Sequence, residues 1–248
     1  MEVIYERCCG IDVHKNTLMA CVYLGVRKKE IRRYGTMTDD ILEMVNWLKS
    51  VDCTIAAMES TGVYWKPVYN ILESEGIEAI VVNAQHIKSV PGRKTDVKDA
   101  EWIANLVRHG LVKSSYIPDR EQRELREMVR YRNEIVNERA REINRIHAVL
   151  EGANIKLGSV LTDISGKSGI EILTAMVSGV TDPVELSALA KGRATDKAPQ
   201  LQRALKGSTG QHQMQMLKYQ LEHIAFLSSQ IESMDEEIKK KRDQSRNT

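Results

Sequence analysis

Aromatic side chains are scarce in this chain of 248 residues: they make up 5% of the sequence, and only one of them is a phenylalanine. Few side chains are therefore available to stack against unpaired bases. Net charge is scarce too, because 36 Lys and Arg residues oppose 34 Asp and Glu residues for a formal net charge of +2. A polyanion would have to be gripped by local clusters of basic residues, not by a diffuse positive field.

The sequence also lacks the cysteine spacing of a structural zinc site. No C-x-x-C pair occurs among its four cysteines, which are Cys8, Cys9, Cys21 and Cys53. All four lie in apolar, strand-like segments, so we expect buried, reduced thiols. The first residues have no apolar stretch of the signal-peptide kind, and no apolar run approaches the roughly 20 residues that span a bilayer. These absences predict a cytoplasmic protein with no membrane partner.

The first half of the chain alternates strand-like with helix-like segments. Five runs are apolar and rich in β-branched residues: 7–13, 17–24, 30–34, 54–58 and 78–82. Three segments have helical period: one that Thr38 or Asp39 would cap, with Ile41, Met44, Val45 and Leu48 on its apolar face, then 63–75 and 99–109. Tight turns join the first three strands into an antiparallel meander, whereas helical crossovers make the later strands parallel. The pattern predicts an RNase H-like mixed five-stranded sheet with helices on both faces.

In the second half of the chain, the apolar residues recur only with the period of a helix. Apolar residues recur every three or four positions through 120–151 and again through 211–241, as in a coiled-coil seam. Between them lie a Gly- and Ser-rich stretch, 152–169, and two short helical segments, 171–177 and 183–190. We expect an α/β domain over 1–117 and an all-α coiled-coil domain over 118–248. Its long helices would form either an antiparallel hairpin or an oligomerisation arm.

Four acidic residues are candidates for chemistry. Asp12 follows the first strand and Glu59 the fourth, and in the expected sheet these strands are parallel neighbours whose carboxyl ends meet at one edge. Asp96 and Asp99 begin a helix and share one side of it. Each alone could be a turn residue, a cap or a first-turn acid stabilised by the helix dipole. The expected fold brings all four acids together, which favours a site for hard divalent cations, Mg²⁺ or Mn²⁺. Such ions can promote phosphodiester displacement.

Basic residues are clustered in two places. One cluster lies beside the acidic helix and consists of Lys88, Arg93, Lys94 and Lys98. The other lies along the first long helix, with Arg123, Arg126 and Arg130 followed by Arg132, Arg139, Arg141 and Arg145. Either cluster could be a solvated surface or a contact to the phosphate backbone of structured RNA or DNA. The two interpretations predict different salt dependence of binding.

Three motifs carry a family resemblance: Asp-Val-His-Lys at 12–15, Glu-Ser-Thr-Gly-Val-Tyr at 59–64 and Lys-Thr-Asp-Val-Lys-Asp-Ala at 94–100. Together they resemble the DEDD transposases of the IS110 insertion-sequence family, relatives of the Piv/MooV DNA invertases with a RuvC-like N-terminal domain. The resemblance spans roughly residues 7–117.

This resemblance implies that Asp12, Glu59, Asp96 and Asp99 are the catalytic, metal-binding acids. It also implies a recombinase directed by a structured guide RNA, acting on donor and target DNA as a homodimer or higher oligomer. The family's serine nucleophile is expected beyond residue 248. The chain therefore resembles an N-terminal fragment, which we do not expect to recombine DNA alone.

Three alternatives compete with the transposase interpretation. Sugar-kinase-like ATPases share the expected fold, but they need a Gly-rich phosphate loop where this chain has residues 13–16, Val-His-Lys-Asn. A stand-alone junction-resolvase-like nuclease would show metal-dependent nicking by the chain itself. A non-catalytic scaffold would bind nucleic acid through the helical half without using the acids.

Overall fold

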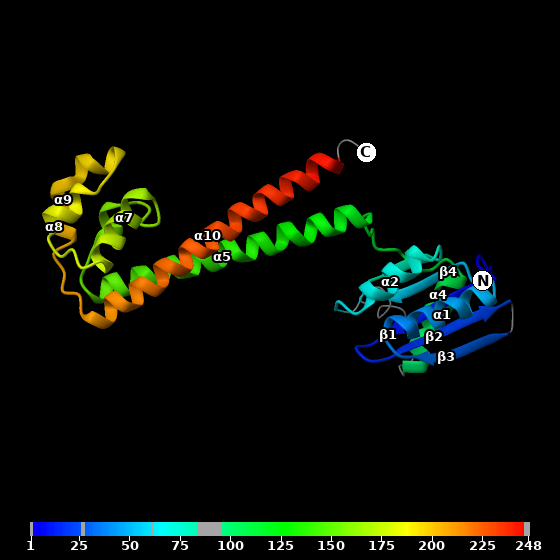
Figure 1. Cartoon of the computed structure of the whole chain (residues 1–248). Coiled ribbons are helices and arrows are strands. Elements are labelled where there is room, and N and C mark those ends of the chain that lie inside the picture. Colours follow the sequence, from blue (N-terminus) through cyan, green and yellow to red (C-terminus); the bar gives the residue numbers. More distant parts are fainter. Residues whose placement is uncertain (1, 26–27, 61, 84–95, 246–248) are drawn as a thin grey trace. The chain divides into compact units, whose positions relative to one another are not determined.

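The computed structural model describes residues 2–25, 28–60, 62–83 and 96–245, and the chain divides into two compact units, Met1–Pro118 and Asp119–Thr248 (Figure 1). The boundary lies one residue after the one expected from the sequence. No helix in the described ranges is both long and apolar enough to cross a membrane.

Unit 1 is built on a sheet of five strands. They are β1 (Arg7–Val13), β2 (Leu18–Leu24), β3 (Lys29–Tyr34), β4 (Ile55–Glu59) and β5 (Glu78–Val82). The spatial order is β3-β2-β1-β4-β5, with β1, β2 and β3 antiparallel and with β4 and β5 parallel to β1. A meander extended through helical crossovers onto the other side of β1 is the RNase H-like topology, so the predicted fold class is confirmed.

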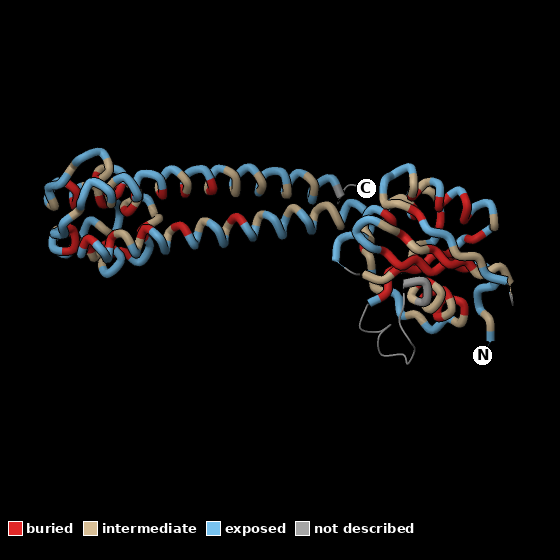
Figure 2. Tube along the Cα trace, turned by 90° about the horizontal axis from the view of Figure 1, so that it is seen from below, coloured by how far each residue is buried: buried red, intermediate tan, exposed pale blue. Residues whose placement is uncertain are grey.

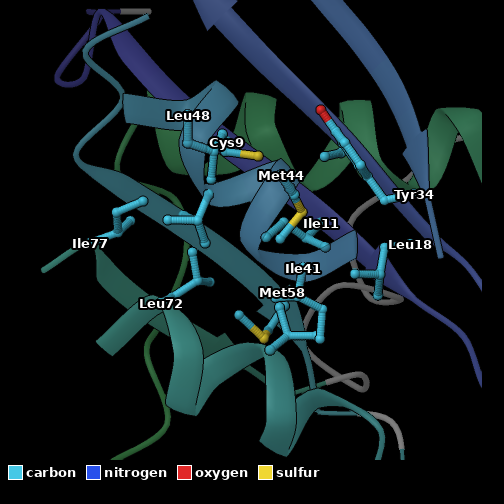
Figure 3. Close-up of a cluster of buried hydrophobic side chains, with 14 of the residues drawn as sticks. Cys9, Ile11, Leu18, Tyr34, Ile41, Met44, Leu48, Met58, Leu72 and Ile77 are labelled. Atoms are coloured by element: carbon cyan, nitrogen blue, oxygen red, sulfur yellow. The ribbon is translucent and has the colours of Figure 1, made fainter. Parts of the chain in front are cut away.

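Helices cover both faces of this sheet (Figure 2). On one face lie α1 (Thr38–Ser50) and α2 (Trp65–Ser74), which enclose a core that includes Ile11, Met44 and Leu72 (Figure 3). On the other face lies α4 (Asp96–Arg108), which packs against Cys8 and Ala57. The central strands are thus buried on both sides, which explains why their sequences read as continuous apolar runs.

The starts of α1, α2 and α4 differ from the prediction. Neither Thr38 nor Asp39 caps α1: Met37 takes the capping position, and its backbone N–H donates to Oδ2 of Asp40 at 3.1 Å. A carboxylate three residues into a helix can satisfy a free N–H in this way, so no short polar side chain is needed at the cap. α2 begins at Trp65, two residues after the expected 63, and α4 begins at Asp96, three residues before the expected 99.

Unit 2 contains two long antiparallel helices, α5 (Arg120–Gly152) and α10 (Gln211–Ser245), which lie side by side (Figures 1 and 2). Contacts between them run in opposite order along the two helices: Glu124 with Lys241, Arg132 with Asp235, Arg139 with Ser228, and Glu142 with His223. Of the two arrangements expected from the sequence, this is the hairpin within one chain. The seam of α10 therefore has a partner in cis.

Short helices pack at the closed end of the hairpin. They are α6 (Leu157–Val160), α7 (Lys167–Val177), α8 (Pro183–Ala188), the 3-10 helix η1 (Gly192–Lys197) and α9 (Ala198–Ala204). Their apolar residues share one core with Ile146 and Leu150 of α5 and with Leu217 and Ile224 of α10. This core gives unit 2 its globular end.

All four cysteines are buried free thiols, as expected. Burial raises the pKa of Cys8 to about 12 and that of Cys21 and Cys53 to about 11, from an ordinary value of 9.0. The buried thiols thus contribute stability that is fully present below the unfolded-state pKa and is lost as the pH rises toward 11.

We therefore expect the folded chain to react slowly with a thiol-specific chromogenic reagent at about pH 8, because little thiolate is present or accessible. All four thiols should react once guanidinium unfolds the chain. Rapid reaction of any thiol in the native chain would show that it is accessible in solution.

Candidate metal centre at the ends of two parallel strands

Asp12 and Glu59 lie side by side at one edge of the sheet. β1 and β4 are paired in parallel up to Ile11 and Met58, and the two acids are the next residues of each strand. Neighbouring strands are about 4.8 Å apart, so the backbones that carry the two carboxylates are direct neighbours. The sequence prediction that these two acids meet is supported by the register.

Both acids point to the face of the sheet that α4 covers. Residues alternate between the two faces along a strand. Ile11 lies in the core under α1 and α2, whereas Cys8 and Ala57 pack with α4. Asp12 is four residues after Cys8 on β1, and Glu59 is two residues after Ala57 on β4. Each acid is therefore on the same face of the sheet as its neighbour and faces α4.

Gly10 allows α4 to lie unusually close to β1. A Cβ atom at Gly10 would fall inside van der Waals distance of the backbone O of Ala100 and N of Ala104, and 2.9 Å from the Cα of Ala104. Glycine in a strand interior often marks such an approach of another backbone. The two alanines on the helix keep its side of the contact small as well.

α4 runs in the opposite direction to β1, so its first turn lies toward the end of β1 that carries Asp12. The thiol of Cys8 contacts the backbone O of Ala104 at 3.5 Å, and Gly10 faces the turn from Ala100 to Ala104. From Cys8 to Gly10 the contacts thus extend from Ala104 toward Ala100, so β1 and α4 run in opposite directions. Asp12, two residues further along β1, lies toward the N-terminal end of α4.

Asp12 is a shielded carboxylate with a histidine beside it. The residue is 9% exposed, and Nε2 of His14 lies 3.0 Å from its Oδ2. The sequence interpretation gave His14 no role. The available signal was the Asp-x-His spacing, because residues two apart in extended backbone lie on the same side.

The structure places two of the four predicted acids, Asp12 and Glu59, on neighbouring strand ends. Asp99 is half-buried in the first turn of α4. Asp96 begins α4, and its side chain lies outside what the structure describes. Within the described part of the chain, no three His, Cys, Asp or Glu side chains form a metal-ion cluster. The four-acid centre therefore stays a prediction.

The two predicted basic clusters are described to different extents. Lys88, Arg93 and Lys94 lie outside the described residues, as does the side chain of Lys98. On α5, Arg126 and Arg130 are exposed and Arg123 is half-buried. The remaining arginines of the predicted cluster divide into two groups. Arg132, Arg139 and Arg145 bond to other residues of unit 2, whereas Arg141 is exposed.

Comparison with solved structures finds similarity to RuvC. RuvC of T. thermophilus in complex with a Holliday junction substrate is 14% identical, with a TM-score of 0.34, over 45% of this chain and 100% of that one. A second Thermus thermophilus RuvC structure is 14% identical, with a TM-score of 0.33, over 44% of this chain and 99% of that one. The fold class follows from the order and direction of the strands in the sheet.

Comparison by sequence gives the family. None of the curated proteins matches this chain. A family model described as a transposase, of the DEDD type found in IS110 elements, matches residues 9–155. The match includes most of β1 with Asp12, β4 with Glu59, and all of α4 and α5. More than half of the chain is covered, and it therefore belongs to the IS110 family of DEDD transposases.

Proposed function

We propose that unit 1 is the metal-dependent phosphodiester-processing centre of a DNA transposase, in which Asp12, Glu59, Asp96 and Asp99 bind Mg²⁺ or Mn²⁺. The observation that carries the proposal is the adjacent placement of Asp12 and Glu59 on the face covered by α4. Family membership supports the assignment to nucleic-acid chemistry.

The residues present fit a hard divalent cation. Asp12 and Glu59 offer carboxylate oxygens, the ligands that Mg²⁺ and Mn²⁺ prefer. Two adjacent carboxylates repel each other, more strongly where water is excluded, and Asp12 is mostly shielded from water. A bound cation would replace this repulsion with attraction. When bound, such an ion would stabilise charge on the attacking and leaving oxygens of a phosphodiester.

Two further residues serve as positioning residues in this proposal. His14 contacts the carboxylate of Asp12 and restricts its rotation. Gly10 sets the distance between β1 and α4, and with it the distance between Asp12 and the acids at the start of that helix. Neither residue is proposed to touch the substrate.

The partners follow from family membership alone. We propose donor and target DNA, a structured guide RNA, and assembly as a homodimer or larger oligomer. The predicted phosphate contacts of Lys88, Arg93, Lys94 and Lys98 belong to the same proposal.

The decisive experiment measures Mn²⁺ binding by isothermal titration calorimetry on the chain and two variants. Loss of a second-shell group typically weakens metal binding by about 10- to 100-fold, so removing a ligand should cost at least that much. We expect Asp12→Asn and Glu59→Gln each to weaken Mn²⁺ binding by about 100-fold or more. Saturating Mn²⁺ should also raise the melting temperature of the unsubstituted chain but not that of the variants.

Glu43→Gln is the matched control, because Glu43 is an exposed acid of α1 on the opposite face of the sheet. It loses the same charge and should bind Mn²⁺ like the unsubstituted chain. Unchanged Mn²⁺ affinity in both Asp12→Asn and Glu59→Gln would refute the proposed site.

A further inference from the structure

One face of α5 carries only arginine and asparagine over six helical turns. Its members are spaced three or four residues apart and form what we call the outer stripe: Arg123, Arg126, Arg130, Asn133, Asn137, Arg141 and Asn144. At 3.6 residues per turn, these spacings keep all seven side chains within about a quarter of the helix circumference. No acidic or aromatic residue lies in the stripe.

The outer stripe faces away from α10. The α5 residues that contact α10, such as Arg132 and Arg139, lie about half a turn around the helix from the stripe. Six of the seven stripe residues are exposed, and Arg123 is half-buried. Figure 2 shows exposed residues recurring along the length of α5. The six exposed residues of the stripe therefore lie away from the contacts that join α5 to α10.

The exposed arginines of the stripe are available for a partner. Arg132 and Arg145 form ion pairs with Asp235 and Glu142. In the described part of the chain, Arg126, Arg130 and Arg141 form no ion pair. Arg126 also has no acid three or four residues away in either direction, where a helix would place its ion-pair partner.

The flanks of the stripe are unequal. Three exposed acids, Glu127, Glu134 and Glu138, line one flank. The other flank is uncharged over the same turns and includes Val129 and Ala140. A polyanion is therefore attracted to the line of the stripe itself and is repelled from one side of it, which fixes how it can lie.

We infer that the outer stripe docks along the major groove of double-stranded DNA. A helix with its side chains is about 10–12 Å across, and the B-DNA major groove is about 12 Å wide. The major groove of duplex RNA is too deep and narrow to admit a helix. The stripe spans 21 residues of rise, about 32 Å, which is close to one turn of B-DNA.

The order of residues suits this placement. A straight helix is closest to the groove floor at its middle, where Asn133 and Asn137 can reach base edges, adenine above all. Arg126, Arg130 and Arg141 lie to either side of these asparagines, where the phosphate backbones cross the helix. The absence of aromatic residues argues against a single-stranded partner held by stacking. This inference goes beyond the proposed metal chemistry, because neither the acids nor a cation enters it.

The test is a titration of the whole chain with a mixed-sequence DNA duplex, followed by fluorescence anisotropy at several salt concentrations in EDTA. Each lost phosphate contact should reduce the slope of log affinity against log salt by about one unit. We expect the triple variant Arg126→Ala, Arg130→Ala and Arg141→Ala to lose about three units of slope. The pair Asn133→Ala and Asn137→Ala should weaken binding about fivefold or more with the slope unchanged.

The matched control removes three exposed positive charges from the other end of unit 2, at Arg193, Arg203 and Lys206, each changed to Ala. It should leave the slope within one unit of that of the unsubstituted chain. Equal losses in both triples would show that net charge alone matters and would overturn the proposal. So would tighter binding to duplex RNA of the same length, or a slope unaffected by the stripe triple. If circular dichroism shows misfolding, the corresponding Arg→Gln triple replaces the alanine variant.

Discussion

Replacing Gly10 with alanine should lower the melting temperature of unit 1 by roughly 10 °C. The added methyl group would collide with backbone atoms of Ala100 and Ala104, and neither a rotamer change nor a smaller side chain can relieve a collision with backbone. Overpacking a core typically costs about 1–3 kcal/mol, and this site belongs at the upper end of that range. For a unit of this size, 1 kcal/mol corresponds to about 4 °C. Differential scanning calorimetry of the whole chain measures the shift.

Gly152→Ala is the control for this substitution. Gly152 ends α5, and a Cβ atom there would meet only the side-chain Nε2 of Gln213, at 3.9 Å. Its melting temperature should be unchanged or slightly raised, since alanine favours helix. Gly10→Ala should in addition weaken Mn²⁺ binding, because α4 must move away from Asp12. A melting temperature within 2 °C of the unsubstituted chain would mean that α4 does not lie as close to β1 as described.

The sheet could be predicted from the sequence because its strands differ sharply in pattern from the helices around them. β1 and β5 were predicted with the same bounds that the structure shows, and the parallel pairing of β1 with β4 followed from the helical crossovers. The small helices α6 and α9 were not predicted. Each is too short to show a period, and tertiary contacts hold them, such as the bond from the N–H of Lys156 to the backbone O of Ala204.

The candidate site was predicted in part, for similar reasons. The adjacency of Asp12 and Glu59 follows from topology, which the sequence pattern specifies. The contact between His14 and Asp12 depends on side-chain rotamers, which no pattern specifies. The role of Gly10 could be predicted only in part. A glycine within a strand indicates that another backbone approaches closely, but only the fold identifies α4 as the approaching element.

The arginines of α5 also show what the sequence pattern alone does not specify. The seven arginines of the predicted cluster looked equivalent in the sequence, as basic residues on one amphipathic helix. The structure separates those that bond within unit 2, such as Arg132 and Arg139, from exposed ones such as Arg126. The separation depends on which face of α5 meets α10, and the period of the apolar residues alone could not say whether that partner was in the same chain.

The hairpin seam provides the second large expected effect. Leu217 is 0% exposed and Ile224 is 3% exposed, and both lie in the core that α10 shares with α5 and the short helices. Changing both to Asp removes two large apolar side chains, at about 2–5 kcal/mol each, and buries two carboxylates without partners. The apolar loss alone is about 4–10 kcal/mol, comparable to the roughly 5–15 kcal/mol that stabilises a typical domain, and burial of the carboxylates adds to it. We expect unit 2 to unfold.

The matched control uses the same helix, the same substitutions and the same spacing of seven residues. Tyr219 is 59% exposed and Phe226 is 58% exposed, so changing both to Asp adds the same charges to α10 without burying them. Circular dichroism at 222 nm should show a large loss of helix for the Leu217 and Ile224 pair and little loss for the control pair. Limited proteolysis should then degrade unit 2 and leave a protected fragment close to Met1–Pro118, because that unit has its own core. Equal loss of helix in both pairs would mean that added charge, and not burial in the seam, decides the stability of α10.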